Sequence, residues 1–176
     1  MSTHDIDTYK QPVAEESIAT NEVTAVTPWE EAREQLEEAQ KYWLATVQPN
    51  GQPHVMPLFA VWSEGCLYFT AGETTRKAKN LAQSPHCVIT VAGQGLDLIV
   101  EGEAVKVSDK ARLQRVADVY ASKYDWHITV RDGAYFAEYG APSAGPPPYE
   151  LYEIRLMKAF GLGTAEPYGA TRWCFS

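Results

Sequence analysis

A β-strand, a polar turn and a basic helix follow one another in Leu67-Tyr-Phe-Thr-Ala-Gly-Glu-Thr-Thr-Arg-Lys-Ala-Lys-Asn-Leu81. The apolar run Leu67–Ala71 predicts the strand, and Thr75, Arg76 and Lys77 open the helix. Backbone N–H groups at a helix start are unpaired and the helix dipole is positive there, so added hydroxyls and cations build an anion site. The same residues also suit an ordinary capped helix with a solvated basic face. The spacing therefore leaves two interpretations, a phosphate site and a plain capped helix.

Short strand-like runs dominate the rest of the chain. A Pro-Asn-Gly-Gln turn at 49–52 is a strong hairpin signal between the first two of them. The predicted strands are Trp43–Gln48, His54–Trp62, Cys66–Ala71, Cys87–Val91, Leu96–Val107, Tyr149–Leu162 and Ala170–Phe175. Many short antiparallel strands with two or three helices predict an α+β protein built on a β-barrel.

The N-terminal part of the chain is expected to be a flexible acidic arm that leads into a helix. Residues 1–27 are polar and lack periodicity. Thr27 is a good N-cap, Pro28 fits the first helical position and Glu30 completes a capping box. We therefore expect the first helix to begin at this point and to end near Tyr42.

A second long helix is predicted after the central strands. Ser108 is a suitable cap for an amphipathic helix that runs through about Tyr124. Residues 125–148 are expected to be irregular, and they end in a Pro- and Gly-rich loop over 141–148. A loop of this length inside a compact domain is usually functional or mobile.

The charge of the 176-residue chain is concentrated in one part of it. Residues 1–40 carry ten Asp and Glu against two Lys and Arg, whereas residues 41–176 carry thirteen of each. A neutral body with an acidic arm is a poor nucleic-acid binder. No apolar run approaches the roughly 18 residues of a membrane span. The acidic, polar start does not resemble a signal or transit peptide, so we expect a cytoplasmic protein without a membrane partner. The cysteines Cys66, Cys87 and Cys174 and four scattered histidines form no metal-ligand spacing, so no metal is expected.

The stretch resembles the FMN-phosphate motif of the pyridoxamine 5′-phosphate oxidase-like split-barrel flavoproteins. In that family a strand ending in Tyr/Phe-Thr leads to a Ser/Thr-Arg-Lys-x-x-x-Leu helix, matched here by Phe69-Thr70, Thr75-Arg76-Lys77 and Leu81. Further similarity is seen in Trp43–Val47, Pro53–Pro57, Ile99–Val107 and Thr171–Phe175. The resemblance covers roughly residues 28 to 176 and implies a single flavin-binding domain, a predominantly antiparallel split β-barrel with flanking helices.

The resemblance also implies which residues contact the cofactor. The set is His54, Val55, Met56, Pro57, Phe69, Thr70, Thr75, Arg76, Lys77, Lys79, Asn80, Arg172 and Trp173. Arg76 and Lys77, with the Thr70 and Thr75 hydroxyls, are expected to hold the phosphate, while Lys79 either joins them or faces water. Residues 54–57 resemble the strand that lines the flavin ring, although apolar side chains there also suit plain barrel core. Arg172 and Trp173 resemble residues contributed by a partner chain, which implies a homodimer with sites at the subunit interface.

Three functions are consistent with these residues. The first is an FMN-dependent oxidoreductase that transfers hydride to or from a small substrate. The second is a deazaflavin-dependent reductase of the same fold, because Lys77-Ala-Lys79-Asn-Leu81 resembles the phosphate turn of those enzymes. The third is a non-catalytic protein that binds a flavin or a tetrapyrrole, since no strong general base or nucleophile stands out. Tyr68, Tyr120, Tyr124 and Tyr135 are candidate proton donors, and the substrate-phosphate residues of the biosynthetic oxidase have no convincing counterpart.

Overall fold

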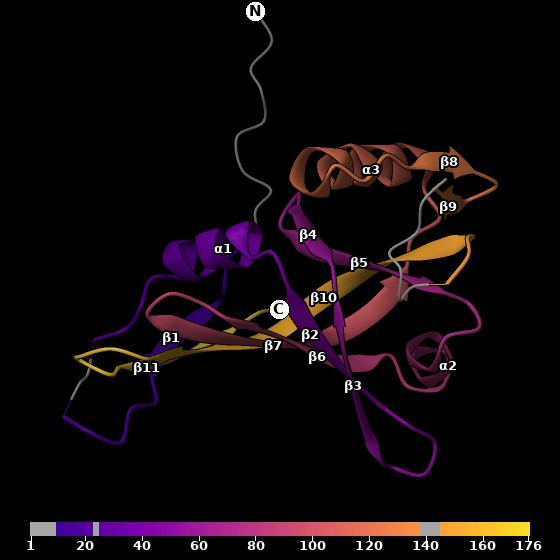
Figure 1. The fold of residues 1–176 in the computed structure, drawn as a ribbon. Helices are drawn as coiled ribbons and strands as arrows, with labels where there is room; N and C mark the ends of the chain where they lie inside the picture. Colours follow the sequence, from indigo (N-terminus) through magenta and orange to yellow (C-terminus); the bar gives the residue numbers. More distant parts are fainter. Residues whose placement is uncertain (1–9, 23–24, 138–144) are drawn as a thin grey trace, which may run out of the picture.

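The computed structural model describes residues 10–22, 25–137 and 145–176. Its helices are α1 (Trp29–Glu38), α2 (Arg76–Gln83) and α3 (Lys110–Tyr124). Its strands are β1 (Ala14–Ser17), β2 (Tyr42–Val47), β3 (Pro53–Leu58), β4 (Ala60–Ser63), β5 (Cys66–Gly72), β6 (His86–Ala92), β7 (Leu96–Lys106), β8 (Thr129–Arg131), β9 (Ala134–Phe136), β10 (Tyr149–Gly163) and β11 (Ala170–Cys174). Figure 1 shows α1 and α3 above the sheet and α2 at one end of it.

The long strand β10 organises an antiparallel sheet. Along one side it pairs with β7 from Tyr152 to Gly163, with a register shift between Leu156 and Lys158. Along the other side it pairs first with β5 and then with β11. The sheet continues in the order β1-β11-β10-β7-β6-β2-β3 and does not close. This change of neighbour along one strand produces the predicted split β-barrel, so the α+β fold class is confirmed.

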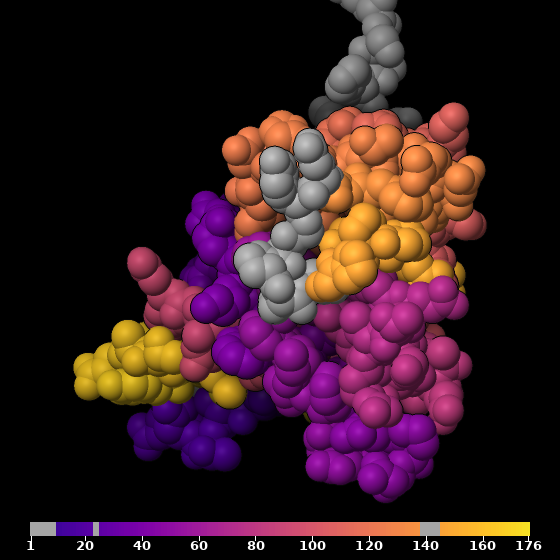
Figure 2. Space-filling model, turned by 45° about the vertical axis from the view of Figure 1, so that its right-hand side comes forward, coloured from indigo at the N-terminus to yellow at the C-terminus, as the bar shows by residue number. Residues whose placement is uncertain are grey.

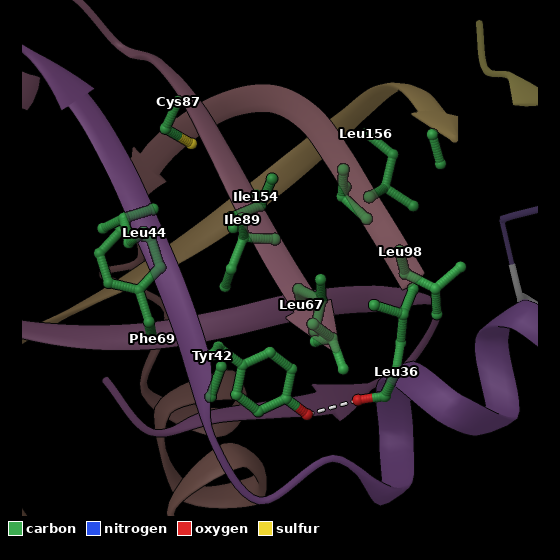
Figure 3. Close-up of a cluster of buried hydrophobic side chains, with 14 of the residues drawn as sticks. Leu36, Tyr42, Leu44, Leu67, Phe69, Cys87, Ile89, Leu98, Ile154 and Leu156 are labelled. Carbon is green, nitrogen blue, oxygen red and sulfur yellow. Dashed lines mark hydrogen bonds between the residues drawn. The ribbon is translucent and has the colours of Figure 1, made fainter. Parts of the chain in front are cut away.

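Two apolar clusters hold the sheet and the helices together. The larger one fills the inner face of the sheet beneath α1, and Figure 3 shows Leu44, Phe69, Ile89 and Ile154 converging in it. The smaller one packs α3 against β4, β5, β9 and β10. Alternating burial along β2 and β6 follows from side chains that point to opposite faces of a sheet. The inner face is therefore core, and the outer face is where a ligand or a second chain can bind.

The first helix differs from its predicted boundaries at both ends. Pro28 is its N-cap and makes no side-chain cap bond, while Glu15 Oε1 accepts from the Trp29 N–H at 3.3 Å and the Thr27 N–H donates to Thr171 Oγ1 at 2.9 Å. The predicted capping box at Thr27 is therefore wrong. The helix ends at Glu38, before the expected Tyr42, whose buried ring opens β2 and whose hydroxyl donates to the Leu36 carbonyl (Figure 3).

Two further predictions from the sequence, one of a strand and one of an irregular segment, are also wrong. The run His54–Trp62 is not one strand, because β3 pairs with β2 while β4 pairs with β5. The chain changes partner at Phe59, which lies between them. The segment 125–148, expected to be irregular, contains the β8–β9 hairpin. The Pro- and Gly-rich loop predicted over 141–148 falls partly outside the described residues.

Part of the acidic arm belongs to the sheet. Strand β1 pairs with β11 from Ala14 to Ser17, so the prediction of a flexible arm is wrong for these residues. Glu16 also forms an ion pair with Arg172 on the neighbouring strand. The strand escaped prediction because it lies at the sheet edge with its side chains largely exposed, so it needs no apolar alternation.

Candidate functional site

The N-terminus of α2 is built by Thr75. Its hydroxyl donates to the Gly72 carbonyl at 2.7 Å and accepts from the Ala78 N–H at 3.3 Å. Thr75 is therefore the N-cap, and its side chain fixes the turn between β5 and α2. The remaining N–H groups of the first turn face outward with the positive end of the helix dipole.

Three cations surround this helix start. Arg76 and Lys79 are exposed, and Lys77 is half-buried. Within the described part of the chain none of their three side chains forms a hydrogen bond or an ion pair. Burial lowers the pKa of the Lys77 ammonium, because desolvation penalises its charged form. A half-buried ammonium without a counterion is costly, and an anion bound at this turn would remove that cost.

Two residues predicted to contact the cofactor lie in the core instead. Phe69 is fully buried and stacks on Tyr152 with ring centroids 5.2 Å apart, because the inward positions of β5 fill the barrel. Asn80 is 1% exposed and faces β2, where its Nδ2 donates to Thr46 Oγ1 at 2.9 Å. Their side chains are therefore turned away from the surface, and their predicted contacts with a cofactor stay predictions. Thr70, next to Phe69 on β5, is partly exposed.

Strand β3 forms an exposed wall beside the α2 turn. His54 is half-buried, while Val55, Met56 and Pro57 are exposed, with Val55 at 50% and Met56 at 44%. The alternative of plain barrel core is thus wrong for Val55, Met56 and Pro57. Figure 2 shows the β2–β3 hairpin and α2 as adjacent parts of one face. The predicted phosphate turn and the predicted ring-lining strand therefore lie next to each other.

The outer face of the sheet next to β3 is apolar. Trp43 and Val47 on β2 are 47% and 43% exposed. Directly opposite pairs connect Pro57 to Trp43, Trp43 to Thr90 and Thr90 to Ile99 across four strands. We call the set Trp43, Val47, Val55, Pro57, Val88, Ile99 and Phe160 the outer apolar face. An exposed apolar surface of this kind marks a binding or association surface.

The two predicted C-terminal site residues have different surroundings. Trp173 is fully buried, packs on Trp29 at a centroid distance of 5.4 Å, and donates from Nε1 to the Thr27 carbonyl at 3.2 Å. Its ring therefore lies inside its own chain, and its role at a partner's site stays a prediction. Arg172 is half-exposed and its Nε donates to Glu16 at 2.7 Å.

A partly open cleft lies in another part of the molecule. A cleft of about 410 Å³ between α1, β4 and α3 is lined by Glu37, Trp62, Asp118, Val119, Ser122 and Lys123. None of these is a predicted site residue. The α2 turn is an open surface in the single chain.

The candidate tyrosine proton donors are structural. Burial raises the pKa of Tyr68, Tyr120, Tyr124 and Tyr135, that of Tyr124 to about 12. The Tyr135 hydroxyl donates to the Leu113 carbonyl at 2.6 Å, and that of Tyr124 to the Ala60 carbonyl at 2.8 Å. These groups keep their protons at neutral pH and use them inside the fold.

Thr46 is the site-related residue that the sequence did not reveal. It is a buried polar side chain at an inward position of β2, after Tyr42 and Leu44. That break in the apolar alternation was the available signal. Among the described residues no cluster of three or more His, Cys, Asp or Glu side chains could hold a metal ion, and no described helix is long and apolar enough to span a membrane.

Comparison with known proteins supports the fold and places the chain in a family. An FAD-binding protein from Mesorhizobium loti superposes with a TM-score of 0.56 at 17% identity, covering 93% of this chain and 98% of its own. A heme-binding protein from Mycobacterium smegmatis superposes with a TM-score of 0.61 at 16% identity, covering 85% of this chain and 59% of its own. An F420 reductase superposes with a TM-score of 0.51 at 22% identity, covering 72% of this chain and 94% of its own. No curated protein matches by sequence. The pyridoxamine 5′-phosphate oxidase family model matches residues 28–162, and the chain therefore belongs to that family.

Proposed function

We propose that this protein is an FMN-dependent oxidoreductase that acts on a small substrate and works as a homodimer. The observation that carries the proposal is the half-buried Lys77, which lacks a counterion among the described residues and lies at a capped helix start. The FMN phosphate supplies the missing charge, with Arg76 able to bind it bidentately and Lys77 acting as a point charge. Thr75 keeps the turn in place, and Thr70 is a partly exposed hydroxyl near the end of β5, the strand that leads into the turn.

The flavin ring would lie against β3 and the outer apolar face. Edge strand β3 has unpaired backbone groups on its outer side, which suit the polar edge of the ring. Val55 and Pro57 offer an apolar surface on that strand. When bound, the flavin supplies hydride transfer, while the protein binds it, orients it and excludes water.

A second copy of the chain would cover this open site. The outer apolar face contains exposed large side chains such as Trp43, and a two-fold axis would bring two equal faces together. Each flavin would then lie between the β3 of one protomer and surface from its partner. Arg172, at the far end of the row Trp43–Thr90–Ile99–Phe160–Arg172, is a candidate contact across that interface.

A deazaflavin-dependent reductase is the second candidate. The exposed Lys79 side chain has no ion-pair partner among the described residues, and it lies three residues after Arg76, on the same side of α2. It therefore extends the cationic surface next to Arg76, which suits a longer anionic tail. The structural similarity to an F420 reductase agrees with this alternative. A non-catalytic flavin- or tetrapyrrole-binding protein is the third, and steady turnover of a reductant by the purified protein would exclude it.

The test begins with the absorption spectrum of the purified protein and the mass of any ligand released by heat. We expect FMN, and binding of FMN and the deazaflavin measured side by side separates the first two candidates. Arg76→Ala with Lys77→Ala should weaken FMN binding roughly tenfold to a hundredfold, because a hydrogen bond to a charged group contributes about 1.5–3 kcal/mol. Lys110→Ala is the matched control, an exposed lysine at the first position of α3. Equal FMN affinity in both variants would refute the phosphate site.

A further inference from the structure

The side chain of Asn80 ties the cationic helix to the sheet. It lies one turn after Arg76, is 1% exposed, and its Nδ2 donates to Thr46 Oγ1 at 2.9 Å. Thr46 is itself 2% exposed on the inner face of β2. Among the described residues, no other side chain of α2 forms a hydrogen bond with the sheet. A helix of eight residues moves as one body, so a displacement of Asn80 also displaces Arg76 and Lys77.

Two buried polar atoms next to this bond lack a partner among the described residues. They are Asn80 Oδ1 and His54 Nδ1. His54 is directly opposite Thr46 in the β2–β3 ladder, so the two side chains share the inner face with Cβ atoms roughly 5 Å apart. An amide oxygen accepts and a ring nitrogen donates in one tautomer, so the two atoms have complementary needs. A small shift or one buried water between them would satisfy both.

We propose that Asn80, Thr46 and His54 form a positioning network that sets the cationic turn of α2 at a fixed place relative to the β2–β3 hairpin. The network touches no phosphate itself. It acts through Lys77 and Arg76 by holding the helix that carries them, while His54 connects the same network to the strand beside the flavin ring. The inference rests on the proposed phosphate site and adds to it the residues that determine its position.

The test compares FMN with riboflavin, which has the same ring but no phosphate. The ratio of the two dissociation constants isolates the phosphate contribution, because any change in the ring wall affects both ligands. Thr46→Val keeps the side-chain shape and removes the acceptor of Asn80. We expect it to lower the preference for FMN about three- to tenfold and to leave riboflavin affinity within about twofold. Thr46→Ser should restore the preference, and His54→Phe should lower it.

The control must show that a loss of stability by itself does not change the ratio of the FMN and riboflavin dissociation constants. Val116→Ala in the separate cluster under α3 is the control, since it destabilises the fold far from α2. If Thr46→Val does not fold, Asn80→Ala tests the same bond with a good helix former. A wild type without preference for FMN would overturn the phosphate site and the network together. A wild type that prefers FMN, with Thr46→Val or Asn80→Ala folded and equally selective, would overturn the network alone.

Discussion

Replacing Gly161 with alanine should destabilise the protein by about 1–3 kcal/mol, the usual cost of overpacking a core. A Cβ at this position would lie 2.5 Å from Cη2 and 2.9 Å from Cζ3 of Trp173, and 3.1 Å from Cδ1 of Leu96. The indole cannot easily move, because it is fully buried against Trp29 and its N–H is bonded to the Thr27 carbonyl. The strain must therefore be absorbed by the core.

Urea unfolding followed by tryptophan fluorescence measures this cost. We expect a lower midpoint with an unchanged slope, since the substitution alters stability and not the surface exposed on unfolding. In thermal unfolding the melting temperature should fall by roughly 2–4 °C for each kcal/mol in a chain of this size. Combining Gly161→Ala with Trp173→Phe should recover part of the loss, because the smaller ring frees the space that the new methyl group needs. The coupling energy of this double-mutant cycle should reach about 1 kcal/mol.

The same experiment tests the assignment of Trp173 to the core. If Gly161→Ala is as stable as the wild type within about 0.5 kcal/mol, the Trp173 ring does not lie against residue 161. The prediction from family resemblance, in which Trp173 reaches a partner's flavin, would then regain support. A loss of stability that depends on the indole leaves Arg172 as the C-terminal candidate for an interface contact.

Three further predictions concern other parts of the molecule. Burial lowers the pKa of Lys123 from 10.5 to about 8. Above pH 8 the unfolded chain therefore binds more protons than the folded chain, so the free energy of unfolding should rise from pH 8 to about 9. Above that pH the buried thiols of Cys66 and Cys87, whose pKa is raised, begin to oppose the rise. Lys123→Met should flatten that rise in pH-dependent urea titrations, and an identical slope would contradict the assignment. Asp125 ends α3 at φ 54°, so Asp125→Gly should stabilise the fold by about 0.5–1 kcal/mol in the same assay, and a loss of stability would argue against this cap geometry. Trp43→Glu on the outer apolar face should yield a folded monomer in sedimentation analysis, whereas an unchanged dimer would place the interface elsewhere.

Local signals made much of the fold predictable. The Pro-Asn-Gly-Gln turn gave the β2–β3 hairpin, with Gly51 at φ 83°. The strand–Thr–Arg–Lys–helix unit gave β5 and α2, whose helix begins at Arg76. In these cases neighbouring residues supply both the geometry and the partners, so no distant contact is needed to decide the structure.

The features that the sequence did not reveal depend on contacts between residues far apart in the sequence. Strand β1 exists because β11 offers it an edge, more than 150 residues later in the chain. The Thr27 N–H donates to the Thr171 hydroxyl and takes no part in a capping box. Trp173 is core because Trp29 and Gly161 leave space for its ring. Asn80 likewise turns inward because Thr46 accepts its hydrogen bond. Pattern and resemblance identify residue types here, but tertiary pairing decides which way each side chain faces.

The distribution of charge over the fold explains how an acidic chain can retain an anion site. All of the net charge of −8 belongs to residues 1–40, which include β1 and α1. Figure 1 places these elements at the opposite end of the sheet from α2. Screening at physiological ionic strength acts over about 8 Å, so those carboxylates have little effect on the potential at the α2 turn. Glu73 lies in the same turn, but no described carboxylate forms an ion pair with these cations, which leaves them available for phosphate. FMN binding at this turn should therefore depend on salt through the local cations, and deleting residues 1–9 should leave that dependence unchanged.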